Sequence, residues 1–308
     1  MTTKNSFGVV PLVLLVLSLA LPMALPAAET PSAADQEYEA AVKAASQVLQ
    51  RGPTEAKLLD QATIKLPEGY GFIPSREAGR YLRAIGNVLH ADPVGLILPI
   101  GENRASWFVV VEWDKAGYIK DDDAKDWKAD ELLDSIKEGT KAGNEERRSR
   151  GIPELEVIGW VETPKYDAMS HQLVWSVSSK HTGDTSSSNR GINYNTYALG
   201  REGYFSLNLV TDLNSIEADK PAARTLLSGM NFTGGKSYAD FNSSTDRVAE
   251  YGLAALVAGV AAKKLGLLAV IAAFFVKFAK IIAVVGVAVL VSLRKWWKGR
   301  EGGGMPKT

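Results

Sequence analysis

The chain has 308 residues and no cysteine, and its 35 Lys and Arg balance its 35 Asp and Glu. The missing cysteines exclude disulfides, thiolate metal sites, a cysteine nucleophile and the lipid-modified cysteine of a lipoprotein. The charges are unevenly spread: residues 247–308 carry ten Lys and Arg against two Asp and Glu, whereas residues 5–246 carry 24 against 33. An acidic main part argues against nucleic acid as a partner and against anionic lipid as its ligand.

An apolar run at residues 8–25 follows Lys4 and precedes small residues that end at Ala28. This order is typical of a secretory signal peptide. We therefore expect residues 1–28 to be a signal peptide that is cleaved after Ala28, with a retained signal anchor as the alternative. A mature chain of this length can bury a sufficient core without disulfides.

Residues 29–246 are predicted to fold as one α+β domain. Apolar periodicity and helix stop signals predict helices at 35–51, 75–88, 124–150 and 214–230. Alternating and β-branched residues predict strands at 62–72 and 107–113, and two hairpins that pair 155–163 with 171–179 and 191–199 with 204–211. Strand runs mixed with end helices favour a mostly antiparallel sheet with its helices on one face.

The last fifth of the chain, residues 251–293, is almost continuously apolar and is followed by a basic and aromatic run. Lysines at positions 263, 264, 277 and 280 divide it into pieces that are each shorter than the roughly 20 residues needed to cross a bilayer. The window 274–293 makes the least costly single span, because its lysines lie near one end, where they reach the interface. A helical hairpin that turns at residues 277–280 and an amphipathic stretch before the span are the alternatives.

We therefore expect residues 247–308 to be a membrane anchor, a C-terminal transmembrane helical region with a basic cytoplasmic tail. A cleaved signal peptide places the main domain on the other side of that membrane, and the lipid bilayer is then a partner of the chain. The residues expected at the membrane interface are Lys277, Lys280, Arg294, Lys295, Trp296, Trp297 and Lys298.

Asp121, Asp122 and Asp123 form the most conspicuous polar cluster of the domain. Three adjacent carboxylates suit a Ca²⁺ or Mg²⁺ ion, although an EF-hand is excluded because Asp126 stands where that loop needs glycine. The structural alternative is that Asp123 caps the helix predicted from residue 124, while its neighbours favour the positive end of the helix dipole. Both interpretations stay open at this point.

The remaining motifs predict no cofactor. Residues 234–237 read GGKS, but Met230 stands where a P-loop needs its first glycine. The three histidines, His90, His171 and His181, are far apart and lack the partner motif of a zinc or histidine-based catalytic site.

Several segments resemble the DUF2167 family of bacterial membrane-anchored proteins. They are 117–124 (GYIKDDDA), 144–147 (NEER), 159–160 (GW), Pro164, 166–167 (YD), 238–242 (YADFN), 245–246 (TD) and 251–259 (YGLAALVAG). The resemblance covers nearly the whole mature chain in the same order. It implies an envelope membrane protein of Gram-negative type, and it implies no activity, catalytic residue or cofactor. Together with the expected signal peptide and anchor, we expect a protein of the inner membrane whose main domain is periplasmic. The sheet with end helices is also similar to the PsbP-like fold, which is an analogy of fold alone.

Two functions from different classes agree with these observations. The first is a non-enzymatic periplasmic interaction module that is tethered to the inner membrane and binds an envelope protein. The alternative is a metal-dependent envelope hydrolase that uses Asp121, Asp122 and Asp123.

Overall fold

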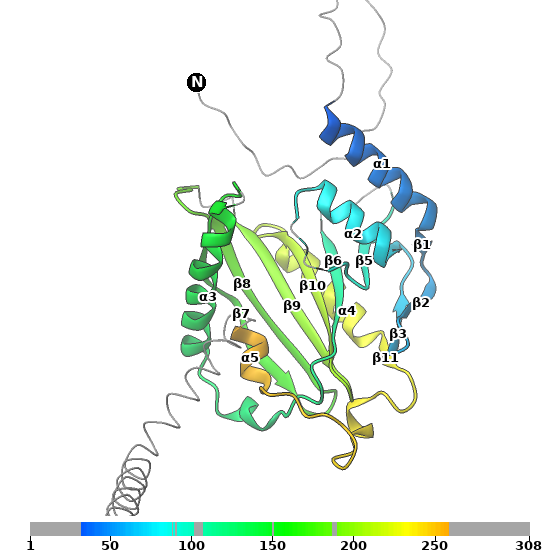
Figure 1. Ribbon diagram of the computed structural model, residues 1–308, viewed down its shortest axis with the longest axis vertical. Helices are drawn as coiled ribbons and strands as arrows, with labels where there is room; N and C mark the ends of the chain where they lie inside the picture. Colours follow the sequence, from blue (N-terminus) through cyan, green and yellow to red (C-terminus); the bar gives the residue numbers. More distant parts are fainter. Residues whose placement is uncertain are drawn as a thin grey trace, which may run out of the picture.

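An eight-stranded antiparallel sheet organises the fold, as the computed structural model in Figure 1 shows. The structure describes residues 32–87, 89, 91–101, 107–149, 151–186 and 190–258. The predicted signal peptide, His90, and the predicted span with its interface residues lie outside these ranges. Among the described residues, no helix has the length and apolarity to cross a membrane.

The large sheet has the strand order β1-β4-β5-β6-β10-β9-β8-β7. Its strands are β1 (Gln50–Arg51), β4 (Tyr70–Pro74), β5 (Gly95–Pro99), β6 (Phe108–Asp114), β7 (Leu155–Asp167), β8 (Gln172–His181), β9 (Gly191–Leu199) and β10 (Tyr204–Asp212). A small antiparallel sheet has the order β11 (Met230–Phe232), β3 (Ala62–Leu66) and β2 (Thr54–Leu58). The prediction of an α+β domain with a mostly antiparallel sheet is confirmed.

One face of the large sheet packs against α4 (Ile216–Ser228) and the small sheet. Alternate residues of the central strands supply this core, because side chains in a strand point to the two faces in turn. Val109 and Val111 of β6 and Phe205 and Leu207 of β10 belong to it, and none of the four is exposed to solvent.

The opposite face carries two helix pairs at its two ends. Helices α1 (Ala33–Val48) and α2 (Ser75–Ala84) pack over β4 and β5, while α3 (Ala129–Ser149) and α5 (Leu253–Ala258) pack over the end formed by β8 and β7. The prediction that the helices lie on one face is therefore wrong. The physical reason lies in strands such as β8, where Trp175 and Val174 are apolar on opposite faces, so that both faces need cover.

Both predicted hairpins are confirmed, as β7 with β8 and β9 with β10. The strand predicted at 62–72 is two strands in different sheets, since Gly69 turns the chain with φ +82° between β3 and β4. The helix predicted from residue 124 starts later: the short 3₁₀ helix η1 (Asp122–Lys125) precedes α3. Buried Asn144 then fixes α3 to β7, because its side-chain amide exchanges two hydrogen bonds with the backbone of Leu155, at 2.8 and 3.0 Å.

Residues 247–258, which the sequence placed in the anchor segment, pack on the domain. Leu253, Leu256 and Val257 of α5 are buried in the same apolar cluster as Leu173 and Trp175 of β8. The described domain therefore continues beyond residue 246, as far as Ala258.

Candidate functional site at the junction of the domain and its C-terminal segment

Two segments that lie far apart in the sequence meet at one end of the sheet. Tyr118 donates its backbone N–H to the carbonyl of Arg247 at 2.8 Å, and its own carbonyl accepts the N–H of Ala249 at 2.8 Å, which makes a parallel bridge between Tyr118 and Val248. Gly117 permits this approach, because its φ is +95° and a Cβ there would lie 2.7 Å from the Arg247 oxygen. The segment after β6 thus holds the segment that leads into α5.

Asp123 fastens the same junction at the start of α5. Its two carboxylate oxygens accept the backbone N–H groups of Leu253 and Ala254, each at 3.0 Å. The N–H groups in the first turn of a helix have no acceptor within the helix, so an acceptor from elsewhere must bond to them. A Cβ at Gly252 would collide with the Asp123 carboxylate, so the close approach also needs that glycine. Asp123 is a capping residue, but for α5 and not for the helix that follows it in sequence.

Asp121 forms its side-chain hydrogen bond with a different part of the fold, the end of β7. It accepts the hydroxyl of Tyr166 at 2.8 Å, and that hydroxyl also lies 3.0 Å from Nδ1 of His171. Because a phenol has one proton and gives it to Asp121, Nδ1 of His171 is the donor in the second bond. Burial first, and then the neighbouring Asp121, raise the pKa of Tyr166 well above its usual value.

The three carboxylates therefore do not converge on one point. Asp121 faces Tyr166, Asp123 caps α5, and Asp122 is exposed. Within the residues that the structure describes, no group of three or more His, Asp or Glu side chains could hold a metal ion. The geometry offers no specific observation in favour of the metal-dependent hydrolase.

Four rings stack beside this acidic group. Tyr118 lies between Phe241 and Tyr238, with centroid separations of 3.8 and 4.3 Å, and His171 stacks on the other side of Tyr238 at 4.1 Å. The Tyr238 hydroxyl donates to the carbonyl of Ile119 at 2.7 Å, and burial raises the pKa of that phenol. Tyr238 belongs to η2 (Tyr238–Asp240), which follows β11, the last strand in the sequence. The ring stack therefore joins the loop after β11 to the segment that follows Gly117.

A charged clamp closes the loop that contains η2. Arg201 bonds Asp246 through two nitrogens, Nε to Oδ2 at 2.7 Å and a terminal nitrogen to Oδ1 at 2.9 Å. The Arg201 guanidinium, together with the N–H of Asn242, holds the pKa of Asp246 far below its usual range. The GGKS segment lies in this loop, after β11, and Gly235 turns it with φ +79°.

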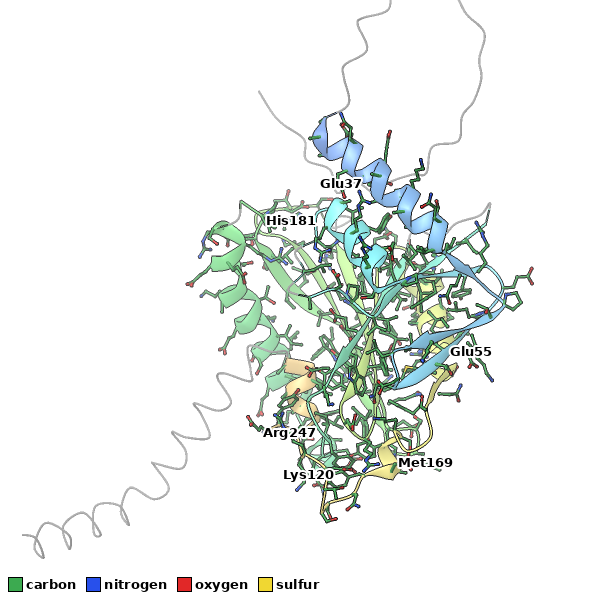
Figure 2. The ribbon with its side chains drawn as sticks, turned by 45° about the vertical axis from the view of Figure 1, so that its right-hand side comes forward. Glu37, Glu55, Lys120, Met169, His181 and Arg247 are labelled. Atoms are coloured by element: carbon green, nitrogen blue, oxygen red, sulfur yellow. The ribbon has the colours of Figure 1, made fainter. Side chains whose placement is uncertain are left out.

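The two histidines that the structure describes do not lie together. His171 belongs to the ring stack, whereas His181 is the last residue of β8, at the other end of the strand. Figure 2 shows the two ends apart, with Met169 of the β7–β8 turn at the bottom and His181 near the top. The described residues thus bring together Asp121, Tyr166 and His171, a contact that sequence spacing did not predict.

Several of the segments quoted for the resemblance to a known family meet at this junction, whereas Asn144 of segment 144–147 bonds Leu155 at the other end of β7. Gly117, Asp123, Tyr166, Tyr238 and Asp246 come from separate parts of the sequence and lie within one contact network. The motif pattern itself was therefore the signal that could have located the site.

Comparisons with known proteins agree with that pattern. A family model described as "Protein of unknown function (DUF2167)" matches residues 50–289. No curated protein matches the chain. Among the solved structures similar to it is the cyanobacterial PsbP protein CyanoP from Synechocystis sp. PCC 6803, with 14% identity, 60% of this chain and 93% of that chain covered, and a TM-score of 0.35.

Another is PA94 of Pseudomonas aeruginosa, a protein of unknown function described as a candidate regulator. It has 11% identity, a TM-score of 0.24, and coverage of 56% of this chain and 90% of that one. Likenesses at these scores carry no argument about activity.

Proposed function

The chain belongs to the DUF2167 family of proteins of unknown function, and we propose that it is a non-enzymatic envelope module. In this proposal the α+β domain lies in the periplasm and binds a partner protein, while the C-terminal segment tethers it to the inner membrane. Nucleic acid is not a partner, in keeping with the acidic charge of residues 5–246.

The junction is the observation that supports this proposal most. The Asp123 cap, the Tyr118–Val248 bridge and the buried face of α5 attach residues 246–258 to the domain at several points. The apolar run of residues 259–293 follows α5 directly in the sequence. A segment that only kept the domain near the membrane would not need to pack on it. A domain that presents one surface to a partner, however, gains from a fixed orientation relative to its anchor.

The location is tested by protease accessibility in spheroplasts of cells that make the full chain with an epitope after Thr308. We expect external protease to digest the domain and to leave the tagged C-terminal tail protected. The matched control is the same digestion after detergent lysis, which should remove both. A domain that resists external protease in intact spheroplasts would contradict the proposed location.

The binding role is tested by in-cell crosslinking of the tagged full-length protein, followed by mass spectrometry. We expect one stoichiometric partner that is lost when residues 29–246 are deleted and the signal and anchor are kept. A full-length protein that yields no partner, or the same partner as the deletion, would contradict a role as an interaction module.

A further inference from the structure

The side chains of Asp121, Tyr166 and His171 meet at one end of the domain, and each is of a type that binds metal ions. They come from the residue before η1, from β7, and from the residue before β8. Figure 2 shows Lys120 and Met169, which lie close in sequence to two of them, at the lower end of the molecule. We call Asp121, Tyr166 and His171 the Asp-Tyr-His triad.

The three donor atoms of the Asp-Tyr-His triad are spaced like the ligands of one small ion. The Tyr166 hydroxyl lies 2.8 Å from Oδ2 of Asp121 and 3.0 Å from Nδ1 of His171, and these last two atoms are 3.9 Å apart. These separations place one point at about 2.0 Å from all three atoms, which is the length of a bond from nitrogen or oxygen to a transition-metal ion. Calcium needs bonds of about 2.3–2.6 Å and is therefore too large.

The directions from that point also distinguish among metals. Oδ2 of Asp121 and Nδ1 of His171 lie nearly opposite each other, and the Tyr166 oxygen lies at roughly 90–100° to both, as in octahedral or tetragonal coordination. Structural zinc is tetrahedral and does not fit this arrangement. The side chains of Asp121 and His171 are 29% and 28% exposed, so an ion and its water ligands can reach the triad from solvent.

The surrounding fold fixes the orientation of His171. Its φ of +52° is left-handed, a conformation that is uncommon for residues other than glycine and that is found preferentially at functional sites. Its carbonyl accepts the N–H of Leu199 at 3.0 Å, and its ring stacks on Tyr238 at 4.1 Å. A ligand that is already held in place by such contacts loses little freedom when the metal binds.

The chemistry of the three donors favours ferric iron. Iron accepts both imidazole and carboxylate ligands, and a tyrosine oxygen binds iron in some haem proteins. A phenolate and a carboxylate together supply two negative charges, which suit a trivalent ion better than a divalent one. Asp167 adds a further negative charge close enough to act on Tyr166, so the surroundings attract a cation.

We propose that the Asp-Tyr-His triad binds one ferric ion, through Oδ2 of Asp121, the phenolate oxygen of Tyr166 and Nδ1 of His171, with water in the remaining positions. The ion replaces the phenol proton, which is released to solvent, and His171 carries its own proton on Nε2. The iron stays ferric throughout. The site would tie β7 and the start of β8 to the segment that continues into the Asp123 cap.

The test titrates full-length protein, stripped of metal and purified in detergent, with Fe³⁺ supplied as its nitrilotriacetate complex. We expect a visible phenolate-to-iron charge-transfer absorption that saturates at one iron per chain. The melting temperature should rise as well, because an ion that binds the folded state stabilises it. Zn²⁺, titrated in the same way, should give a smaller rise.

Two pairs of variants locate the ligands. Tyr166→Phe should abolish the visible absorption, whereas Tyr38→Phe, which changes a partly exposed tyrosine on α1, should keep it. Asp121→Asn should weaken iron binding at least about tenfold, because even changes behind the ligands commonly have that effect. Asp122→Asn removes the same charge from the neighbouring exposed residue and should bind iron like the wild type. If Tyr166→Phe fails to fold, the Asp121 and Asp122 pair still decides.

The site is refuted if the wild type gives no visible absorption, if folded Tyr166→Phe keeps it, or if Asp121→Asn and Asp122→Asn bind iron alike. A larger rise in melting temperature with Zn²⁺ than with Fe³⁺ would refute the choice of ferric iron. Iron binding goes beyond the proposed function and needs neither the partner protein nor the periplasmic location. The proposed function fails instead through the protease and crosslinking experiments, whatever the iron titration shows.

Discussion

The carboxylate of Asp123 and the backbone N–H of Leu253 lie 3.0 Å apart although 130 residues separate them in the chain. One side chain in the middle of the sequence thereby satisfies the first turn of the helix that precedes the apolar C-terminal run. We expect Asp123→Ala to weaken α5 by about 1 kcal/mol, because a helix loses its cap. Hydrogen exchange at residues 253–258 should accelerate in the full-length protein.

The matched control for this cap is the preceding residue. Asp122 is exposed on η1, so Asp122→Ala changes the same charge and leaves the cap in place. Equal rates of hydrogen exchange at residues 253–258 in the two variants would show that Asp123 stabilises α5 through its charge alone.

Gly117 and Gly143 give opposite expectations for the same substitution. Gly117→Ala should destabilise the protein by at least about 1–2 kcal/mol, since an L-residue resists its left-handed conformation and the new Cβ meets Arg247. Gly143→Ala should stabilise by about 0.5–1 kcal/mol, because it lies exposed within α3 with free space around it. Urea unfolding midpoints measure both, and a shift of the same sign in the two variants would refute the argument.

The Arg201–Asp246 clamp should give the protein a distinct acid response. The pKa of Asp246 is lowered in the folded state, mainly by Arg201, from a usual value of 3.8. Its stabilising contribution is therefore complete above about pH 4 and is lost as the pH falls through the lower folded value. Arg201→Gln should lower the melting temperature at neutral pH, and the difference from wild type should shrink in acid. A difference that stays constant with pH would exclude the clamp as its cause.

Glu112 should behave in the opposite sense. Glu112 is exposed on β6, but the protein packed around its carboxyl partly desolvates it and, with Asp114 nearby, raises its pKa above 4.5 in the folded state. Ionisation therefore costs stability as the pH rises through that folded value. Glu112→Gln should consequently raise the melting temperature at pH 7, and the gain should vanish towards pH 4. Glu55→Gln should leave the melting temperature unchanged at both values, and an unchanged Glu112→Gln would show that the carboxyl carries no such cost.

Local patterns predicted most of the secondary structure. The hairpin of β9 and β10 follows from alternating residues on both sides of the turn at 200–203, where Gly200 and Gly203 are bonded at 2.8 Å. The pattern did not show that both sheet faces carry helices. Strand β8 contains apolar residues at consecutive positions, such as Trp175 and Val174, and such a run does not say which elements cover it.

The candidate sites depended on contacts over long sequence separations. Asp121 and Tyr166 are 45 residues apart, and the same separation lies between Arg201 and Asp246. The periodicity of apolar residues within a helix or strand does not show which distant side chains will meet. The acidic triplet was visible in the sequence, but only the fold shows that its members serve different neighbours. The signal peptide and the membrane span remain predictions.

The bridge between Tyr118 and Val248 decides how a mechanical load on the chain beyond Ala258 would reach the fold. Tension would first load α5, which packs over the β7 and β8 end of the sheet, and would then reach the bridge, which lies just after β6, a central strand of the eight. Edge strands peel away one bond at a time, whereas a central strand is held on both sides by its neighbours. The packing of Leu256 and Val257 would therefore bear the tension first, the Asp123 cap next, and the bridge to the segment after β6 last.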